Sequence, residues 1–184
     1  AHVLDVNVGL PEIDEVAMMK KVVKELQSVT DLPLQIDTSD SVAMESALRL
    51  YDGKPLINSV NGKQEIMQSV FPLVKKYGGV VVALTLDEGG IPETAEGRLE
   101  IAKKIITEAE KYNIKKNDII IDFLTLTCGT QQKEAKETLR GISLLKNTPE
   151  FAEVKTVLGV SNISFGLPRR DIINSNFFAM ALNS

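Results

Sequence analysis

The feature that most limits the fold of this sequence is a regular alternation of short apolar runs with stretches of helical periodicity. Continuous apolar runs at residues 80–84, 119–121 and 154–160 are typical of strands buried on both faces of a parallel sheet. Between the runs, apolar residues recur every three or four positions, as in the stripe over 99–109. This alternating pattern predicts an α/β domain in which parallel strands alternate with helices.

The pattern divides the chain into six strand-helix units. The predicted strands are 3–7, 34–37, 56–58, 80–84, 119–122 and 154–162. The predicted helices are 16–26, 41–51, 64–77, 99–109, 131–146 and 171–182. Asp14, Ser41 and Thr94 stand where helix N-caps are expected, and Gly53 and Gly78 where helices should end.

Strict alternation favours a (β/α)8 TIM barrel, which has eight units and about 250 residues when complete. Only about six units are found here, and the chain opens directly on a predicted strand. We therefore expect residues 1–184 to form one barrel domain that lacks its first strand, before Ala1, and its last, after Ser184.

Composition excludes several classes of protein. At 184 residues, 43% hydrophobic and 25% charged, the chain can bury one core and has no segment for a membrane. A net charge of −4 with no basic cluster argues against nucleic acid as a partner. Cys128 is the single cysteine, so no internal disulfide forms, which suits a reducing cytoplasm. Neither Cys128 nor His2 has a partner at metal-ligand spacing, and we expect no metal.

Five predicted strands end on a carboxylate or a carboxamide. These residues are Asn7, Asp37, Asn58, Asp122 and Asn162. Strand ends and the loops after them converge on the face of a barrel that carries the active site. Two carboxylates and several amides in one cup, with no Lys or His among them, suit hydrogen bonding to a flat polar heterocycle.

Each of these residues also has a structural interpretation. Asp37 or Asp122 could cap the following helix instead of binding two parallel N–H donors of a ligand. Asn58 and Asn162 could be turn residues. Gly159 could admit a ligand close to the backbone or relieve crowding in the barrel.

Arginines also stand near the last strand. Arg170 follows Arg169 near the start of the last predicted helix. A guanidinium there could pair with a ligand carboxylate or be simply solvated.

Five segments, in this order, resemble the pterin-binding methyltransferase family. They are LDVNVG at 4–9, QIDTSD at 35–40, INSVNG at 57–62, IDFL at 121–124 and GVSNISFG at 159–166. The resemblance covers the whole chain and is greatest to the methyltetrahydrofolate-binding module of cobalamin-dependent methionine synthase and to methyltetrahydrofolate:corrinoid methyltransferases. It implies a barrel of the pterin-binding type. The Gly-Glu-Arg-like motif of the family's first strand has no counterpart here, in agreement with a missing strand.

The resemblance also implies roles for individual residues. Asp37, Asn58 and Asp122 correspond to ligands of the pterin ring, and Asn162 to a catalytic amide that reaches N5, the nitrogen carrying the methyl group. Weaker positions around the substrate are Gly159, Arg170, Asp5, Asn7, Asn61 and Ser161.

The implied function is transfer of the N5 methyl group of 5-methyltetrahydrofolate to cob(I)alamin, carried by a corrinoid-binding domain or protein. A homodimer is a further expectation. A dihydropteroate synthase-like enzyme is the alternative among enzymes, but that branch has a Ser-Arg-Lys-like segment where this chain has Ser161, Asn162 and Ile163. The alternative outside enzymes is a pterin-binding fragment without catalysis.

Overall fold

Six parallel strands form one sheet in the order in which they occur in the chain, and a computed structural model describes all of residues 1–184. The strands are β1 (Leu4–Val6), β2 (Leu34–Asp37), β3 (Leu56–Asn61), β4 (Val80–Leu84), β5 (Ile119–Asp122) and β6 (Lys155–Val157). The helices are α1 (Glu15–Val29), α2 (Ser41–Leu48), α3 (Gln64–Tyr77), α4 (Ala95–Lys111), α5 (Gln132–Lys146) and α6 (Arg170–Asn183). Three short 3₁₀ helices complete the elements: η1 (Lys116–Asp118), η2 (Pro149–Phe151) and η3 (Val160–Ser164).

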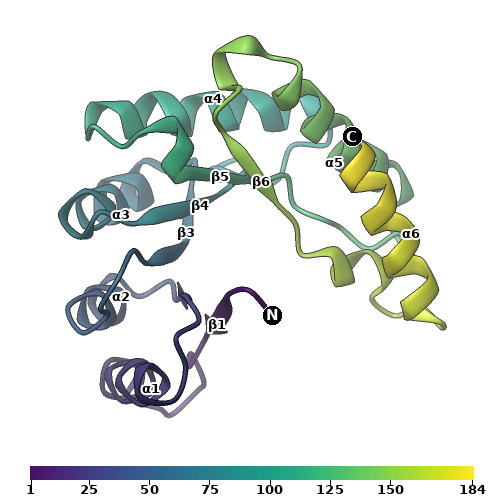
Figure 1. The fold of residues 1–184 in the computed structure, drawn as a ribbon. Coiled ribbons are helices and arrows are strands. Elements are labelled where there is room, and N and C mark those ends of the chain that lie inside the picture. Colours follow the sequence, from purple (N-terminus) through teal and green to yellow (C-terminus); the bar gives the residue numbers. More distant parts are fainter.

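The sheet curves into an open arc with the helices on its convex side (Figure 1). β1 and β6 are the two edges and each pairs on one side only. The predicted α/β alternation and the partial barrel are therefore confirmed. That two further units complete the barrel remains a prediction.

The hydrophobic core lies between the sheet and the helices. Alternate strand residues such as Ile36, Ile57 and Ile121 are fully buried against it. Helices α1 and α4 contribute Met19 and Ile105, which are fully buried as well. None of the helices is long and apolar enough to cross a membrane.

Helix ends follow the local chemistry of the sequence. The Asp14 and Thr94 side chains accept hydrogen bonds from Ala17 N at 3.0 Å and Gly97 N at 3.2 Å, so both predicted N-caps are confirmed. Gly78 ends α3 with φ of 65°, the left-handed conformation that glycine adopts without a steric cost.

One N-cap and one helix end were wrongly predicted, both at α2. Ser41 is the first residue of α2, and Asp40 caps it, because the Asp40 carboxylate accepts from Val42 N at 2.8 Å. The helix also ends at Leu48 rather than at residue 51, so Gly53 does not stop it.

The last strand is much shorter than predicted. β6 is only Lys155–Val157, and residues 160–164 form η3 instead of continuing the strand to Asn162. The last pair of β5 with β6 joins Asp122 to Val157, and β6 has no neighbour on its other side. Residues 158–162 thus have no strand to pair with.

Close packing of α5 on β5 provides a test of the core. A Cβ built on Gly141 would lie 2.4 Å from Phe123 Cδ1, and Phe123 is fully buried. Gly141→Ala should therefore lower the free energy of unfolding by about 1–3 kcal/mol, although alanine favours helix by about 1 kcal/mol. Chemical denaturation would measure this. In the background Phe123→Leu the same substitution should cost much less, and an equal cost in both backgrounds would contradict the clash.

Candidate functional site

The concave face of the sheet carries the polar strand residues. Register pairs Asp5 with Gln35 and Asp37 with Asn58, while the intervening Ile36 faces the helices and is fully buried. Because successive side chains of a strand point to opposite faces, Asp5, Gln35, Asp37 and Asn58 all lie on the concave side. Four polar residues are thus brought together from three strands.

Two hydrogen bonds join the polar residues across β1 and β2. Asn7 Nδ2 donates to Asp37 Oδ2 at 2.9 Å, and Gln35 Nε2 donates to Asp5 Oδ1 at 2.6 Å. Burial raises the pKa of Asp37, the bond from Asn7 lowers it, and the carboxylates of Asp5 and Glu15 raise it further. Asp37 is therefore a carboxylate whose charge is poorly compensated by the chain itself.

Gln35 was not among the predicted site residues. A signal for it was present in the sequence, because Gln35 stands two residues before Asp37 in a strand and so must share its face.

A β-bulge in β3 adds a second amide to the same face. Asn58 pairs with Val82, but Val60 pairs with the next residue, Ala83, so β3 has one extra residue there. Asn58 and Asn61 are three residues apart, a spacing that regular alternation would put on opposite faces. With the bulge both lie on the concave side, and Asn61 Oδ1 accepts from Lys63 N at 3.0 Å.

Asp122 ends β5 on the concave face. It pairs with Leu84, and its Oδ1 accepts one hydrogen bond within the chain, from Leu124 N at 2.8 Å. Burial raises the pKa of the Asp122 carboxyl to about 6, and the bond from Leu124 lowers it only in part. Since this bond occupies Oδ1, the other oxygen remains available to a ligand donor.

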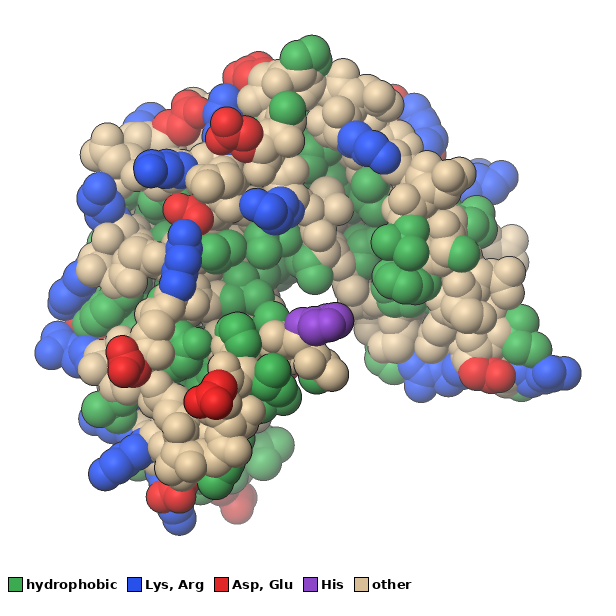
Figure 2. Space-filling view, in the orientation of Figure 1, with side chains coloured by type: hydrophobic (Ala, Val, Ile, Leu, Met, Phe, Trp, Pro, Cys, Tyr) green, Lys and Arg blue, Asp and Glu red, His purple; other side chains and the backbone are tan.

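The remaining concave residues of β4, β5 and β6 are mostly apolar. Register aligns Val82 with Ile120, and Leu84 and Val157 with Asp122. Figure 2 shows hydrophobic side chains gathered in the hollow between the two arms of the arc. Lys155, which pairs with Ile120, faces this side as well, but its Nζ donates to Asn117 O at 3.2 Å near the start of β5. At the strand ends the candidate site therefore combines a polar wall on β1, β2 and β3 with an apolar wall that carries one carboxylate.

Asn162 is presented by η3 rather than by a strand end. Its backbone N donates to Gly159 O at 3.0 Å. A Cβ on Gly159 would lie 2.9 Å from Asn162 Nδ2, so the glycine provides the space that the Asn162 amide occupies. The role of Gly159 toward a ligand remains a prediction.

Arg170 holds the η3 turn. Its Nη2 donates to Ser161 O at 2.9 Å and its Nε to Ser164 Oγ at 3.0 Å. The guanidinium carbon also lies 4.9 Å from the centre of the Phe165 ring. Arg170 thus contacts the segment around Asn162, and the predicted role toward a ligand remains a prediction, as do those of Asp5 and Ser161.

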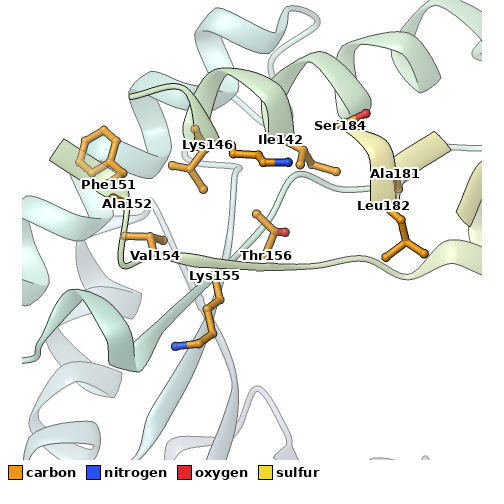
Figure 3. A pocket seen from close by; sticks show the side chains of 11 residues that line it. Ile142, Lys146, Phe151, Ala152, Val154, Lys155, Thr156, Ala181, Leu182 and Ser184 are labelled. Carbon is orange, nitrogen blue, oxygen red and sulfur yellow. The ribbon is translucent and has the colours of Figure 1, made fainter. Parts of the chain in front are cut away.

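Two cavities differ sharply in character. A polar one of about 140 Å³ lies between β2, β3 and their helices and includes Asp37, Asn58 and Asn61 in its lining. The largest, about 460 Å³, is mainly apolar and lies between α5, α6 and β6 (Figure 3). Figure 3 shows Thr156 pointing toward this larger cavity and Lys155 pointing away. None of the predicted site residues lines it, so we assign the candidate site to the concave face.

No three His, Cys, Asp or Glu side chains are grouped as the ligands of a metal ion would be. That the site uses no metal remains a prediction.

Comparison with known proteins agrees with this geometry. A family model described as pterin binding enzyme matches residues 1–184. Methionine synthase of Mycobacterium tuberculosis is 36% identical over 189 residues, which cover 96% of this chain and 16% of that protein. Methylcorrinoid:tetrahydrofolate methyltransferase of Eubacterium limosum is 32% identical and matches 99% of this chain and 67% of its own length. The chain thus spans a small part of the methionine synthases it matches.

Solved structures support the fold. Dihydropteroate synthase of Xanthomonas albilineans matches 100% of this chain and 70% of its own with a TM-score of 0.69 and 20% identity. The Yersinia pestis dihydropteroate synthase gives a TM-score of 0.69 at 18% identity, over 98% and 72% of the two chains. At these identities the likeness establishes the architecture and nothing about the reaction.

The raised pKa of Asp122 predicts how stability depends on pH. The folded state binds the proton of Asp122 more tightly than the unfolded chain, whose pKa is close to 3.8, so ionisation destabilises the fold as pH rises from about 4 to about 6. Asp122→Asn should therefore raise the free energy of unfolding at pH 7–8 by on the order of 2 kcal/mol. The gain should vanish below pH 4. Urea titrations across this range would measure it, and a gain independent of pH would contradict it.

Proposed function

The chain belongs to the pterin-binding enzyme family, and on that premise we propose that it binds 5-methyltetrahydrofolate and transfers its N5 methyl group to cob(I)alamin of another domain or protein. The observation that carries the proposal is the array of amides and carboxylates on the concave face, with Asp37 paired to Asn58 across β2 and β3. Identities of 36% and 32% to methionine synthase and to methylcorrinoid:tetrahydrofolate methyltransferase support the methyl-transfer branch.

The carboxylates suit the amino-pyrimidine edge of a pterin, which presents adjacent N–H donors. Asp122 has one oxygen bonded to Leu124 N, and Asp37 has one bonded to Asn7 Nδ2. The second oxygen of each can accept from the ring. Burial raises the pKa of both carboxyls, and a ligand N–H would compensate the ionised forms that water no longer solvates fully.

Asn58 and Asn61 suit the rest of the ring. Each amide offers a donor and an acceptor, and the bulge in β3 puts both on the concave side. The side-chain oxygen of Asn61, Oδ1, accepts a hydrogen bond from Lys63 N. The side-chain NH₂ group of Asn61 therefore remains available to donate to a ligand.

Asn162 is the proposed catalytic residue. A tertiary amine leaves poorly, so N5 must gain positive character before its methyl group can move. An amide cannot protonate N5 at neutral pH, but it can hydrogen-bond to N5 or to its proton and favour the reactive form. The contacts of Arg170 with Ser161 O and Ser164 Oγ hold the turn that presents this amide.

The corrinoid supplies the nucleophile, and it is a partner in this proposal rather than a ligand built into the chain. The chain has to hold the pterin with N5 facing the open mouth, so that the methyl group stays accessible to the partner domain. The apolar wall formed by residues such as Leu84 and Val157 leaves that side of the ligand without competing polar contacts.

The alternative enzyme is a dihydropteroate synthase. The solved structures that share the fold are enzymes of this kind, but at 20% and 18% identity they bear on the fold alone, and the segment Ser161–Ile163 lacks the lysine expected of that branch. Lys155 does not replace it, because its Nζ donates to Asn117 O at 3.2 Å, beside the start of β5 and away from the strand ends. A pterin-binding fragment without catalysis remains the alternative outside enzymes.

The first test concerns binding. In the full protein that carries this chain, Asp122→Asn should weaken the affinity for methyltetrahydrofolate by about 1.5–3 kcal/mol, the usual scale for a hydrogen bond to a charged group. Affinity of the native protein should also fall as pH drops through about 6, the pKa of Asp122. The variant should lose this pH dependence. Titration calorimetry from pH 5 to 8 measures both, and unchanged affinity in the variant would refute the role of Asp122.

The second test separates rate from binding at Asn162. N5 is the atom whose charge changes during transfer, so a contact to it stabilises the transition state more than the ground state. Asn162→Ala should lower the rate of transfer to cob(I)alamin by one to a few powers of ten, with a smaller effect on affinity. Stopped-flow transfer beside a binding measurement tests this. Equal losses of rate and binding would make Asn162 an ordinary contact, and no loss of either would remove it from the site.

A further inference from the structure

A fully buried arginine lies behind the strand end that carries Asp122. Arg98, in the first turn of α4, has no accessible surface. Its Nη1 donates to Phe123 O at 2.7 Å and to Leu124 O at 3.1 Å, and its Nε donates to Pro92 O at 2.9 Å. The guanidinium thus holds the carbonyls of the two residues that directly follow Asp122.

Thr138 on α5 completes this arrangement. Its hydroxyl oxygen accepts a hydrogen bond from Arg98 Nη1 at 2.9 Å, and the hydroxyl shares its one proton between Leu124 O at 3.0 Å and Glu134 O at 3.1 Å. The Leu124 carbonyl is therefore held from two helices, by Arg98 of α4 and by Thr138 of α5.

Arg98 is costly as a purely structural residue. Its Nη2 is buried without a hydrogen-bond partner, and no carboxylate forms an ion pair with the guanidinium. Burial lowers the pKa of Arg98, which the charges of Glu137 and Glu134 offset only in part. An apolar side chain of similar size at such a position is often neutral or stabilising for a fold. A buried cation that bonds to backbone carbonyls is better explained by a need to fix the backbone geometry there than by a gain in stability of the fold.

The turn that Arg98 holds after Asp122 has an unfavourable backbone conformation. Leu124 has φ of 60°, in the left-handed region that residues with a side chain rarely adopt. In this conformation Leu124 N donates to Asp122 Oδ1 at 2.8 Å. A more relaxed turn would withdraw the one hydrogen bond that orients the Asp122 carboxylate.

The loop that follows β5 also contacts the segment that carries Asn162. Cys128 N donates to Ile163 O at 2.9 Å, and Thr127 Oγ1 donates to Phe165 O at 2.9 Å. Displacement of the turn after Asp122 would therefore be transmitted toward η3 as well.

We propose that Arg98 is a positioning residue of the site: through the Phe123 and Leu124 carbonyls it fixes the turn that orients the Asp122 carboxylate toward the ligand. The ligand of this inference is the methyltetrahydrofolate of the proposed function, on which it rests. Arg98 itself contacts no substrate.

The test uses Thr138→Val, which keeps the shape of the side chain but removes the hydroxyl from Arg98 and Leu124, together with Arg98→Lys. Ile105→Val is the matched control, because Ile105 is buried on the same helix and its change loosens the core without a contact to the turn. Three properties are measured on the full protein: melting temperature, affinity for methyltetrahydrofolate, and hydrogen–deuterium exchange of the peptide 119–130 without ligand.

For the two variants at the turn, exchange of this peptide should rise and affinity should fall by about tenfold, the scale of one lost hydrogen bond to a charged group. Ile105→Val should lower the melting temperature and change neither property. Unchanged affinity in the turn variants, or an equal loss in the control, overturns the proposal. If the native protein does not bind methyltetrahydrofolate, the proposed function fails. The exchange comparison then decides by itself whether Arg98 and Thr138 fix the turn.

Discussion

Strands β1 to β5 must each keep side chains buried against the helices, and the arrangement of the site depends on that requirement. Ile36, Ile57 and Ile121 cannot move to the other face without exposing the core. Their neighbours Asp37, Asn58 and Asp122 are therefore fixed on the concave face by the hydrophobic effect, and not by any attraction among polar groups. The polar wall is positioned before a ligand arrives, which is the condition for tight binding of a rigid ring.

Most of the architecture could be predicted because its signals are local. Apolar runs and helical stripes marked six units. Asp14 and Thr94 cap the starts of two helices and Gly78 ends a third, as their chemistry requires. The family was predicted from short motifs at the strand ends and agrees with the match over residues 1–184. The common face of Asp37, Asn58 and Asp122 follows from their positions at strand ends, and the structure brings them to that face.

What the sequence did not reveal depends on pairing between distant segments. The run 154–160 has strand composition throughout, but only Lys155–Val157 finds a partner, since β5 turns away after Asp122. Asn162 therefore lies in a 3₁₀ turn, where Arg170 holds its neighbours. Arg98 was overlooked although it stands four residues before Ala102 on the apolar stripe of α4. A charge in such a stripe signals buried polar contacts, but the carbonyls it meets are far away in the sequence.

The bulge in β3 means that the length of this strand and the facing of its side chains are decided together. The extra residue near Ser59 puts Asn58 and Asn61, which are three positions apart, on the same face. A strand of equal length paired without the bulge would turn the position of Asn61 toward the helices, whereas a strand one residue shorter would keep both amides in the mouth by plain alternation. A one-residue alignment gap at this point in a relative therefore preserves the set of donors and acceptors, and a relative of equal length that lacks the bulge changes it.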